Sequence, residues 1–411
     1  MLKKYFFLIM ISLLTFLSCT KDNSAPTFRT DLNCNDHENL CDVTNSNNAF
    51  GIDIFKKLHQ TAPEKNIFIS PLSISTALMM TTNGAKGQTY DQITGVLHYD
   101  DLSTGQINST YKLLLTQLPQ LDDQTELNIA NSIWYRNTIP VEEDFLHTNI
   151  DNFNSEIKPS DFNDSETVNL INGWVEDKTQ GLIKTVIDEI SPQAIMYLIN
   201  AIYFKGTWLN RFDADLTTTA LFHLEDNSTK EVEMMQMEDG SMPVPYFKND
   251  IFQAVDLAYG DSIFSMSILL PNQNHTVDDI IEELTPEHWE TWMDAYTTQD
   301  VLLRIPKFKM KYKKELKQTL QDLGMQLPFN TNADFSGIAP VDPLFISFVL
   351  HKSFIEVDEA GTEAAAVTVI GIETTSVPNL PVFIADKPFV FAIRDNQTKS
   401  ILFIGKMMVP E

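Results

Sequence analysis

The sequence predicts an α+β fold in one large domain, and three observations lead to this prediction. Amphipathic helical patterns dominate the first half of the chain, whereas long apolar or β-branched runs dominate the second half. This segregation favours extended antiparallel or mixed sheets over a doubly wound parallel sheet. After Asn48 no linker rich in Gly, Ser or Pro divides the chain, and no internal repeat is visible.

The first 18 residues are predicted to be a lipoprotein signal peptide and are not counted as part of the fold. Lys3 and Lys4 precede an apolar run from Tyr5 to Leu17, which is too short to span a bilayer. The ending "FLSC" resembles the lipobox of bacterial lipoproteins, which are cut before the cysteine and acylated on it, here Cys19. The alternative is a buried N-terminal helix, which the polar and breaker residues of "CTKDNSAPT" disfavour.

Residues 19–47 are predicted to be an acidic polar tether, followed by a domain that spans 48–411. Cys34 and Cys41 are the other cysteines of the chain. In an oxidising compartment they could close a short loop, and free thiols are the alternative. His37 lies between them, but the spacing matches no trusted zinc pattern, so no metal site is predicted.

Helices are predicted where apolar residues recur at a helical period. One such pattern runs from Phe50 to Leu58. In the next, Ser70 is an N-cap candidate, Pro71 suits the first helical position, and Gly84 ends the helix. Further helical patterns cover 107–118, 168–177, 276–296 and 314–323.

Strands are predicted in five apolar or β-branched runs: "IMYLINAIYFKG", "IFSMSILLP", "VLLRIPKFKM", "LFISFVLHKSFIEVD" and "PVFIADKPFVFAIRD". His351 interrupts the fourth run and shares a strand face with Phe345, Ser347 and Val349. A buried and hydrogen-bonded histidine is the expectation for this position.

Composition and motifs argue against nucleic-acid binding and against catalysis. The net charge is −27, and the densest basic run, Lys309 to Lys317, is interpreted as a solvated strand-to-helix segment. The chain has no G-x-S-x-G, H-E-x-x-H, C-x-x-C, phosphate-loop or G-x-G-x-x-G motif. The acidic pairs Glu142-Glu143 and Asp278-Asp279 lie beside helical patterns, where charged first turns explain them. We therefore predict no enzyme activity and no cofactor.

The stretch "EAGTEAAAVTVIGIETTSVP", from Glu359 to Pro378, lies between two predicted strands and lacks turn residues until its end. If residues 362–373 are read as a strand, one face carries small or apolar side chains and the acids Glu363 and Glu373 lie on the other. The residues of the first face are Thr362, Ala364, Ala366, Thr368, Ile370 and Ile372. Such alternation suits a half-buried strand and is poor for a permanent loop. Gly361 provides a pivot just after the preceding strand. The stretch is thus predicted to be a loop in one state and a central strand in another; a surface helix or edge strand is the plainer alternative.

Eight segments, in this order along the chain, resemble the serpins, a family of serine protease inhibitors. The resemblance covers essentially everything from Asn48 to Pro410. The segments are "NIFISPLSISTALMM", "INGWVEDKTQGLI", "LINAIYFKGTWLNRFD", "FSMSILLP", "IPKFKM", "ADFSGI", "VLHKSFIEVDEAGTEAAAVT" and "FIADKPFVFAIRD". The resemblance implies a single domain in which helices pack around three β-sheets, with an exposed reactive-centre loop at about 359–380.

The resemblance also implies a mechanism, which is strand addition by loop insertion. A protease attacks the loop and forms an acyl-enzyme; the cleaved loop then enters the main sheet and the deformed protease is trapped. Inhibitory members carry small residues at the hinge of this loop, which correspond here to Gly361, Thr362, Glu363, Ala364, Ala365 and Ala366.

Other site residues carry over from the family one at a time. Glu359 resembles the hinge acid, with Lys307 as its expected ion-pair partner beside Trp208 at the top of the sheet. The polar cluster that holds the sheet closed at its middle corresponds to Ser70, Ser73, Asn200 and His351.

The family spacing from Glu359 places the cleaved bond between Thr375 and Ser376, while a count back from "KPFVF" points to Val377. No Lys or Arg lies between Glu359 and Asp386, which disfavours a trypsin-like target. An elastase-like or subtilisin-like serine protease is the expected partner, and a cysteine protease stays open.

The leading hypothesis is therefore a suicide inhibitor, expected to be an exported monomer held on the outer membrane only through its N-terminal lipid, with cell-surface exposure left open. The alternatives are a non-inhibitory serpin acting as a binding or structural surface protein and, more distantly, an unrelated enzyme or nutrient-binding lipoprotein.

Overall fold

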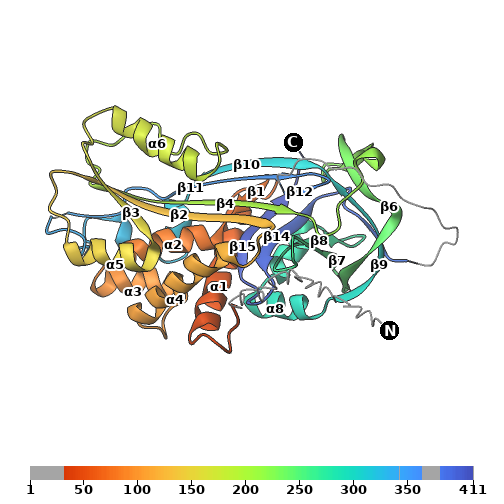
Figure 1. Cartoon of the computed structure of the whole chain (residues 1–411), viewed down its shortest axis with the longest axis horizontal. Helices are drawn as coiled ribbons and strands as arrows, with labels where there is room; N and C mark the ends of the chain where they lie inside the picture. Colours follow the sequence, from red (N-terminus) through yellow and green to blue (C-terminus); the bar gives the residue numbers. More distant parts are fainter. Residues whose placement is uncertain (1–31, 342, 363–379, 411) are drawn as a thin grey trace, which may run out of the picture. The chain divides into compact units, whose positions relative to one another are not determined.

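The computed structural model describes residues 32–341, 343–362 and 380–410, and it confirms an α+β fold of helices packed on extended sheets (Figure 1). The α-helices of this part of the chain are α1 (Leu40–Thr61), α2 (Pro71–Thr82), α3 (Gly87–Val96), α4 (Thr104–Gln117), α5 (Glu143–Phe153), α6 (Glu166–Lys178), α7 (Val277–Glu283), α8 (Pro286–Asp294) and α9 (Lys317–Asp322). Short 3₁₀ turns lie at η1 (Leu118–Gln120), η2 (Ala214–Leu216) and η3 (Leu327–Phe329).

One sheet has the strand order β10-β11-β12-β4-β2-β3. Its strands are β10 (Phe308–Glu315), β11 (Leu350–Val357), β12 (Gly361–Thr362), β4 (Met196–Thr207), β2 (Thr125–Arg136) and β3 (Ser155–Ser160). The pair β2 and β3 is parallel, and the other pairs are antiparallel. The two-residue strand β12 separates β11 from β4, which are far longer.

The second sheet has the order β1-β15-β14-β8-β7-β6-β9-β13, with β5 paired to β6. Its strands are β1 (Ile67–Ile69), β5 (Thr218–His223), β6 (Thr229–Lys248), β7 (Phe252–Ala258), β8 (Phe264–Pro271), β9 (Thr297–Pro306), β13 (Val382–Ile384), β14 (Phe389–Asp395) and β15 (Ile401–Met407). The three expected sheets appear as two hydrogen-bonded ladders, because the long β6 runs through a register shift between Gln236 and Ser241 and joins two of them.

Local signals predicted several helix boundaries. Ser70 caps α2, its side chain accepting a hydrogen bond from Ser73 N at 3.2 Å, and Pro71 begins the helix. The pattern predicted over 276–296 is split into α7 and α8, because Pro286 begins a new helix capped by Thr285. The basic run at Lys309 to Lys317 forms most of β10, in which Lys309 and Lys311 are exposed next to the buried Met310, and the start of α9.

The domain begins earlier than the predicted residue 48. Helix α1 starts at Leu40, and Leu32, Leu40 and Val43 are fully buried in the main core. The tether prediction is therefore wrong for residues 40–47 at least, because polar side chains mask an amphipathic first turn whose apolar residues pack inward. The Cys34 to Cys41 disulfide described below holds the chain just before this helix.

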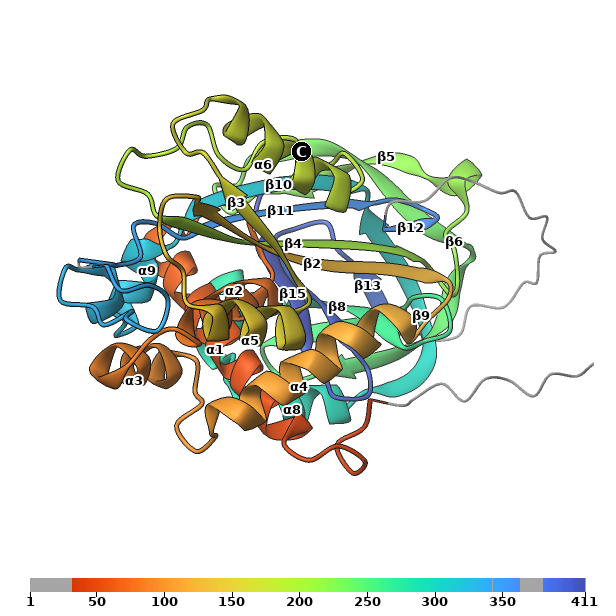
Figure 2. The same ribbon diagram turned by 60° about the vertical axis from the view of Figure 1, so that its left-hand side comes forward.

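The main core lies between the two sheets and the helices α1 and α2, and a smaller core lies under α6. Figures 1 and 2 show α6 on one face of β2 and β4, with α2 on the opposite face. Along β4, Ile202 and Phe204 point into the main core, whereas Tyr197 and Ile199 point toward α6. The α2 face of this sheet is therefore buried, and α6 also covers part of β2 and β4 on the other face, so a strand added beside β4 would have its α2-facing side chains buried.

Candidate functional site

The first described residues of the predicted insertion segment, Glu359 to Thr362, follow β11 and lead directly into a short strand of the same sheet. The chain turns after Val357 and forms β12, so that Val357 pairs with Thr362 on one side. On the other side, Gly361 and Thr362 pair with Thr207 and Gly206 of β4. Figure 2 shows β12 at the end of these two strands. The structure thus differs from the expectation of an exposed loop from Glu359 onward, because Gly361 and Thr362 form β12 and Glu359 and Ala360 are held in the turn before it by the contacts described next.

Asp358 forms the turn that makes this return possible. Its carboxylate Oδ1 accepts hydrogen bonds from the backbone N–H groups of Ala360 at 2.9 Å and Gly361 at 3.1 Å. Its own N–H donates to the Gly361 carbonyl at 2.9 Å. The turn is therefore defined by side-chain and backbone bonds together.

Gly361 occupies a position that no other residue fits. Its φ is +156°, and a Cβ added there would lie 2.0 Å from the Gly206 carbonyl oxygen of β4. That atom belongs to the backbone and cannot rotate away. A glycine is needed for β12 to approach β4 this closely.

Glu359 makes the expected ion pair. Its Oε2 lies 2.9 Å from Lys307 Nζ, and its Oε1 accepts a hydrogen bond from the Thr217 hydroxyl at 2.7 Å. Burial tends to raise the pKa of Glu359, but the bonds from Thr217 and Lys307 outweigh it and lower the pKa below its ordinary value. The Glu359 carbonyl also accepts from Phe212 N at 3.0 Å, so this residue is fixed from three sides.

Trp208 holds the backbone of the same turn. Its indole Nε1–H donates to the Asp358 carbonyl at 2.9 Å, and its backbone N–H donates to the Ala360 carbonyl at 2.9 Å. The indole stacks on Tyr259, with ring centroids 4.4 Å apart and an interplanar angle of 14°. Trp208 is therefore placed where any movement of the hinge would alter its surroundings.

Thr362 is the last residue before the undescribed segment and is 2% exposed. Its hydroxyl lies 2.6 Å from the Tyr259 hydroxyl. Both side chains are buried, which confirms for Thr362 the inward face that parity predicted for this segment.

The predicted mid-sheet cluster is only partly assembled. His351 Nε2 accepts a hydrogen bond from Ser70 N at 3.2 Å, and Ser70 Oγ accepts from Ser73 N. Burial lowers the pKa of His351 to about 4, so the ring is neutral at pH 7. Asn200 instead donates from Nδ2 to Asn131 Oδ1 at 2.8 Å, and its own Oδ1 is buried without a hydrogen-bond partner. The structure thus joins three of the four residues and leaves a buried acceptor on the fourth.

A cavity of about 350 Å³ lies beside this cluster, below β12. It separates residues 196–201 of β4 from residues 343–352, which lead into β11 and form its start. Most of its lining is apolar. Its lining includes Ser73, Leu78, Met196, Leu198, Asn200, Ile346, Phe348 and His351. The cavity is lined by residues 196–201 of β4 and by Leu350, His351 and Lys352 of β11, the same two strands that pair with β12 at Gly206 and Val357.

Several predicted site residues lie outside the described residues. These are the rest of the hinge, Glu363 to Ala366, the expected cleaved bond between Thr375 and Ser376, and the lipid site Cys19. Sequence reasoning missed Thr217, Tyr259 and Asn131, whose partners are set by the tertiary fold, and Asp358, whose side chain bonds the turn that directly follows it. No periodic pattern or motif marks them.

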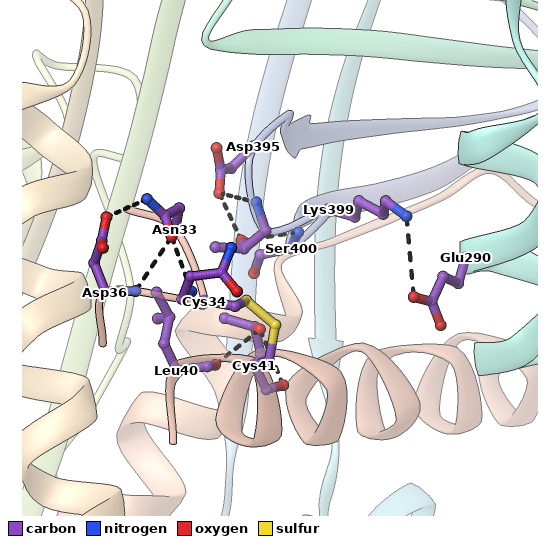
Figure 3. Close-up of a disulfide and its surroundings, with 12 residues drawn as sticks. Asn33, Cys34, Asp36, Leu40, Cys41, Glu290, Asp395, Lys399 and Ser400 are labelled. Atoms are coloured by element: carbon purple, nitrogen blue, oxygen red, sulfur yellow. Dashed lines mark hydrogen bonds and ion pairs between the residues drawn. A yellow bond between two sulfur atoms is a disulfide. The ribbon is translucent and has the colours of Figure 1, made fainter. Parts of the chain in front are cut away.

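Cys34 and Cys41 form a disulfide with a Cα to Cα distance of 5.3 Å, which resolves the two alternatives left open by the sequence (Figure 3). Figure 3 places it next to the turn between β14 and β15, where Asp395 and Ser400 lie. The side chain of Asn48 in α1 bonds the same turn through Lys399 O and Ile401 N. The disulfide therefore links the segment before α1 to the first turn of that helix, while Asn48 holds α1 to the β14–β15 turn.

In residues 32–341, 343–362 and 380–410 no group of three or more acidic, histidine or cysteine side chains is placed to hold a metal ion. Within the same ranges, no helix has the length and apolar character needed to cross a membrane.

Comparison with known proteins gives one consistent result. A family model described as "Serpin (serine protease inhibitor)" matches residues 45–410. The leukocyte elastase inhibitor of Xenopus laevis is 36% identical over 371 residues, covering 88% of this chain and 97% of that protein. Serpin B11 of Homo sapiens is 34% identical over 390 residues, covering 90% of this chain and 99% of that protein.

Solved structures agree with the sequence relatives. The native state of the thermophilic serpin tengpin superposes with a TM-score of 0.82 at 33% identity, covering 89% of this chain and 94% of that one. Thyroxine-binding globulin in complex with thyroxine superposes with a TM-score of 0.81 at 27% identity, covering 90% and 99%.

Proposed function

Because this chain belongs to the serpin family, whose members are generally protease inhibitors rather than enzymes, we propose that it is a suicide inhibitor of serine proteases. The target cleaves the segment between Thr362 and Leu380. The cleaved segment then enters the six-stranded sheet between β11 and β4 while the protease is still attached as an acyl-enzyme.

The observation that carries this proposal is the position of β12. Gly361 pairs with β4, and Thr362 pairs with both β4 and β11, which supports a defined place and register for an inserting strand. Below them, the cavity separates the same two strands. A strand that continued from Thr362 along β4 and β11 would reach this cavity, which residues of both strands line.

The register can be extended residue by residue. Thr362 pairs with Gly206 and Val357, so a residue six positions later would pair with Asn200 on one side and His351 on the other. That residue is Thr368, whose hydroxyl would face the unpaired Asn200 Oδ1. Ile370 and Ile372 would follow into the apolar part of the cavity. Insertion would therefore satisfy a buried acceptor and fill a void at once.

Insertion of the segment would release a large free energy. Net backbone hydrogen bonds contribute about 1 kcal/mol each, so about ten further inserted residues would add roughly 10 kcal/mol. Filling the cavity with isoleucine side chains adds a further favourable contribution from apolar burial. The uncleaved chain withholds this stabilisation until the segment is cut.

The proposed targets are elastase-like or subtilisin-like proteases. No Lys or Arg lies between Glu359 and Asp386, so a pocket that requires a cation has nothing to bind. The similarity to the Xenopus laevis leukocyte elastase inhibitor supports the same choice.

We also propose export and lipid attachment through Cys19. The support is the sequence of residues 1–19, together with a disulfide between Cys34 and Cys41 that is typical of oxidising compartments. Radiolabelled palmitate should be incorporated by the full chain when it is expressed in a bacterium with an outer membrane. A Cys19→Ala variant that still carries the label would contradict this.

The inhibition itself is tested by mixing the chain from Thr20 onward with pancreatic elastase, subtilisin and a papain-like protease, followed by denaturing gels and mass spectrometry. We expect a denaturant-resistant complex with a serine protease and a released peptide that starts at Ser376. Cleavage by all three proteases without any complex would exclude inhibition and favour a non-inhibitory serpin.

A further inference from the structure

The Tyr259 hydroxyl is the feature of the hinge that the inhibitory mechanism above does not explain. It lies after β7, far from the loop in sequence, and it bonds Thr362 at 2.6 Å in the interior. We propose that Tyr259 is a positioning residue: it holds Thr362 in the sheet before cleavage and thereby nucleates loop insertion. This inference rests on the proposed inhibitory function and specifies how the hinge of that site is controlled.

The tyrosine ring is fixed independently of the hinge. It stacks on Trp208, and the edge of Phe204 contacts it with ring centroids 5.0 Å apart. Gly206 leaves room for it, because a Cβ there would lie 2.6 Å from the Tyr259 ring. The backbone of Tyr259 is held by its N–H bond to the Phe264 carbonyl at 2.9 Å. The hydroxyl therefore points at a fixed place in the sheet whether or not Thr362 is there.

The bond biases the hinge toward the inserted position. The Tyr259 side chain is fully buried. Within the described residues, its hydroxyl bonds the hydroxyl of Thr362. Withdrawal of Thr362 would leave a buried hydroxyl unpaired, which is unfavourable. Burial also raises the pKa of Tyr259 well above its ordinary range, so the group stays neutral and the bond does not depend on physiological pH.

The kinetic consequence follows from competition after cleavage. The acyl-enzyme is either hydrolysed, which releases active protease, or trapped by insertion. Starting a new strand is the unfavourable step, since ordering the first residues costs entropy before the later pairs form. With Gly361 and Thr362 already paired, insertion proceeds by adding residues to an existing strand. Without the Tyr259 bond, insertion would again have to start a new strand, so more of the acyl-enzyme would be hydrolysed before it is trapped.

The test uses paired variants in the chain from Thr20 onward, with the protease that forms a complex with the unmodified chain. Tyr259→Phe and Thr362→Val each delete one hydroxyl and keep the side-chain shape. We expect each to raise the number of inhibitor molecules consumed per protease trapped by at least twofold, and the double variant to show no further increase. Thr362→Ser, which keeps the hydroxyl, should behave like the unmodified chain.

A matched control separates this role from general loss of packing. Tyr246 is also a buried tyrosine, and its hydroxyl donates to Gln253 at 3.0 Å in another part of the second sheet. Tyr246→Phe should leave the stoichiometry unchanged. An unchanged stoichiometry in Tyr259→Phe, or an equal rise in Tyr246→Phe, would overturn the proposal.

A second readout needs no protease and distinguishes failure of this inference from failure of the proposed function. Hydrogen exchange of the peptide that contains Gly361 and Thr362 is measured in the uncleaved chain. Tyr259→Phe should speed this exchange at least threefold, and Trp208 fluorescence should shift with it. If hydrogen exchange is unchanged in Tyr259→Phe, the inference is wrong even if the chain inhibits proteases. If exchange speeds up but the unmodified chain forms no complex with a protease, Tyr259 does hold the hinge and the proposed inhibitory function is wrong.

Discussion

At the scale of single residues, the size and hydroxyl of Thr362 determine whether the hinge fits into the sheet. It is buried between β11 and β4 in the uncleaved chain, and it would stay there in the inserted state. Small size and a hydroxyl suit this position, because the neighbouring Gly206 and Tyr259 leave little volume and offer one hydrogen bond.

Thr362→Arg should therefore convert the inhibitor into a substrate. A charge without a partner in this place costs about 3–5 kcal/mol, so the hinge would leave the sheet and insertion would stall. Gels should show cleaved chain and free protease in place of the complex. The exposed Thr229 at the start of β6 offers a matched control, and Thr229→Arg should still trap protease. Trapping by Thr362→Arg with unchanged stoichiometry would contradict the insertion mechanism.

His351 makes a second prediction at this scale, for acid stability. Burial lowers its pKa from 6.5 to about 4, so between these values the unfolded chain binds more protons than the folded chain. The contribution is fully present above pH 6.5 and is lost as the pH falls to 4. At about 1.4 kcal/mol per pKa unit, the unfolding free energy should fall by about 3 kcal/mol through this residue. Protonation would also place a donor opposite Ser70 N, which now donates to Nε2.

The measurement is urea unfolding at pH 7 and pH 4 for the unmodified chain, His351→Gln and the exposed control His147→Gln. The fall in unfolding free energy between the two pH values should be about 3 kcal/mol smaller in His351→Gln than in the other two chains. Equal falls in all three would show that His351 does not titrate in this way.

At the scale of elements, the turn from β11 to β12 sets the state of the hinge. Asp358 closes the turn, and Gly361 allows β12 to approach β4. These two features are local, while Trp208, Lys307 and Tyr259 reach the turn from other strands or their ends. The turn and β12 are thus short in sequence but are held by residues from several distant segments of the chain.

Gly361→Ala should detach β12 from the sheet. The new Cβ would meet the Gly206 carbonyl oxygen, and the φ of +156° would be strained, typically by about 1–3 kcal/mol. Hydrogen exchange at residues 361 and 362 should rise in the uncleaved chain. Gly173→Ala in α6 is the control, since nothing lies near its added Cβ and a helical alanine is favoured. Retained protection at residues 361 and 362 in Gly361→Ala would mean that β12 tolerates a side chain.

The elements also show what a sequence can predict and why. The start of α2 follows from Ser70 and Pro71, because a cap and a first-turn proline act within one helical turn. The inward face of Thr362 follows from strand parity. By contrast, the start of α1 was missed, because burial of Leu32 and Leu40 depends on packing against distant strands. The Glu359 to Lys307 pair was expected only from the family resemblance, since the two residues lie far apart along the chain and no local signal links them.

At the scale of the whole molecule, the candidate site is a property of two sheets and their helices together. Tyr259 directly follows β7 of the second sheet, yet it bonds a residue of β12 in the first. The cavity below β12 is lined by α2, β4 and the chain before β11. A strongly acidic surface, with a net charge of −27, also favours encounter with cationic proteases over acidic ones.

The central claim is that the cleaved segment becomes a strand between β4 and β11, and hydrogen–deuterium exchange before and after cleavage tests it most directly. The chain from Thr20 onward is cut in the segment by a protease that does not form a complex, and exchange is followed in peptides that cover 196–207, 350–357 and 363–372. We predict slow exchange in all three after cleavage, with the greatest gain around Thr368, Asn200 and His351. Exchange in 363–372 that stays as fast as in an unstructured peptide would contradict insertion.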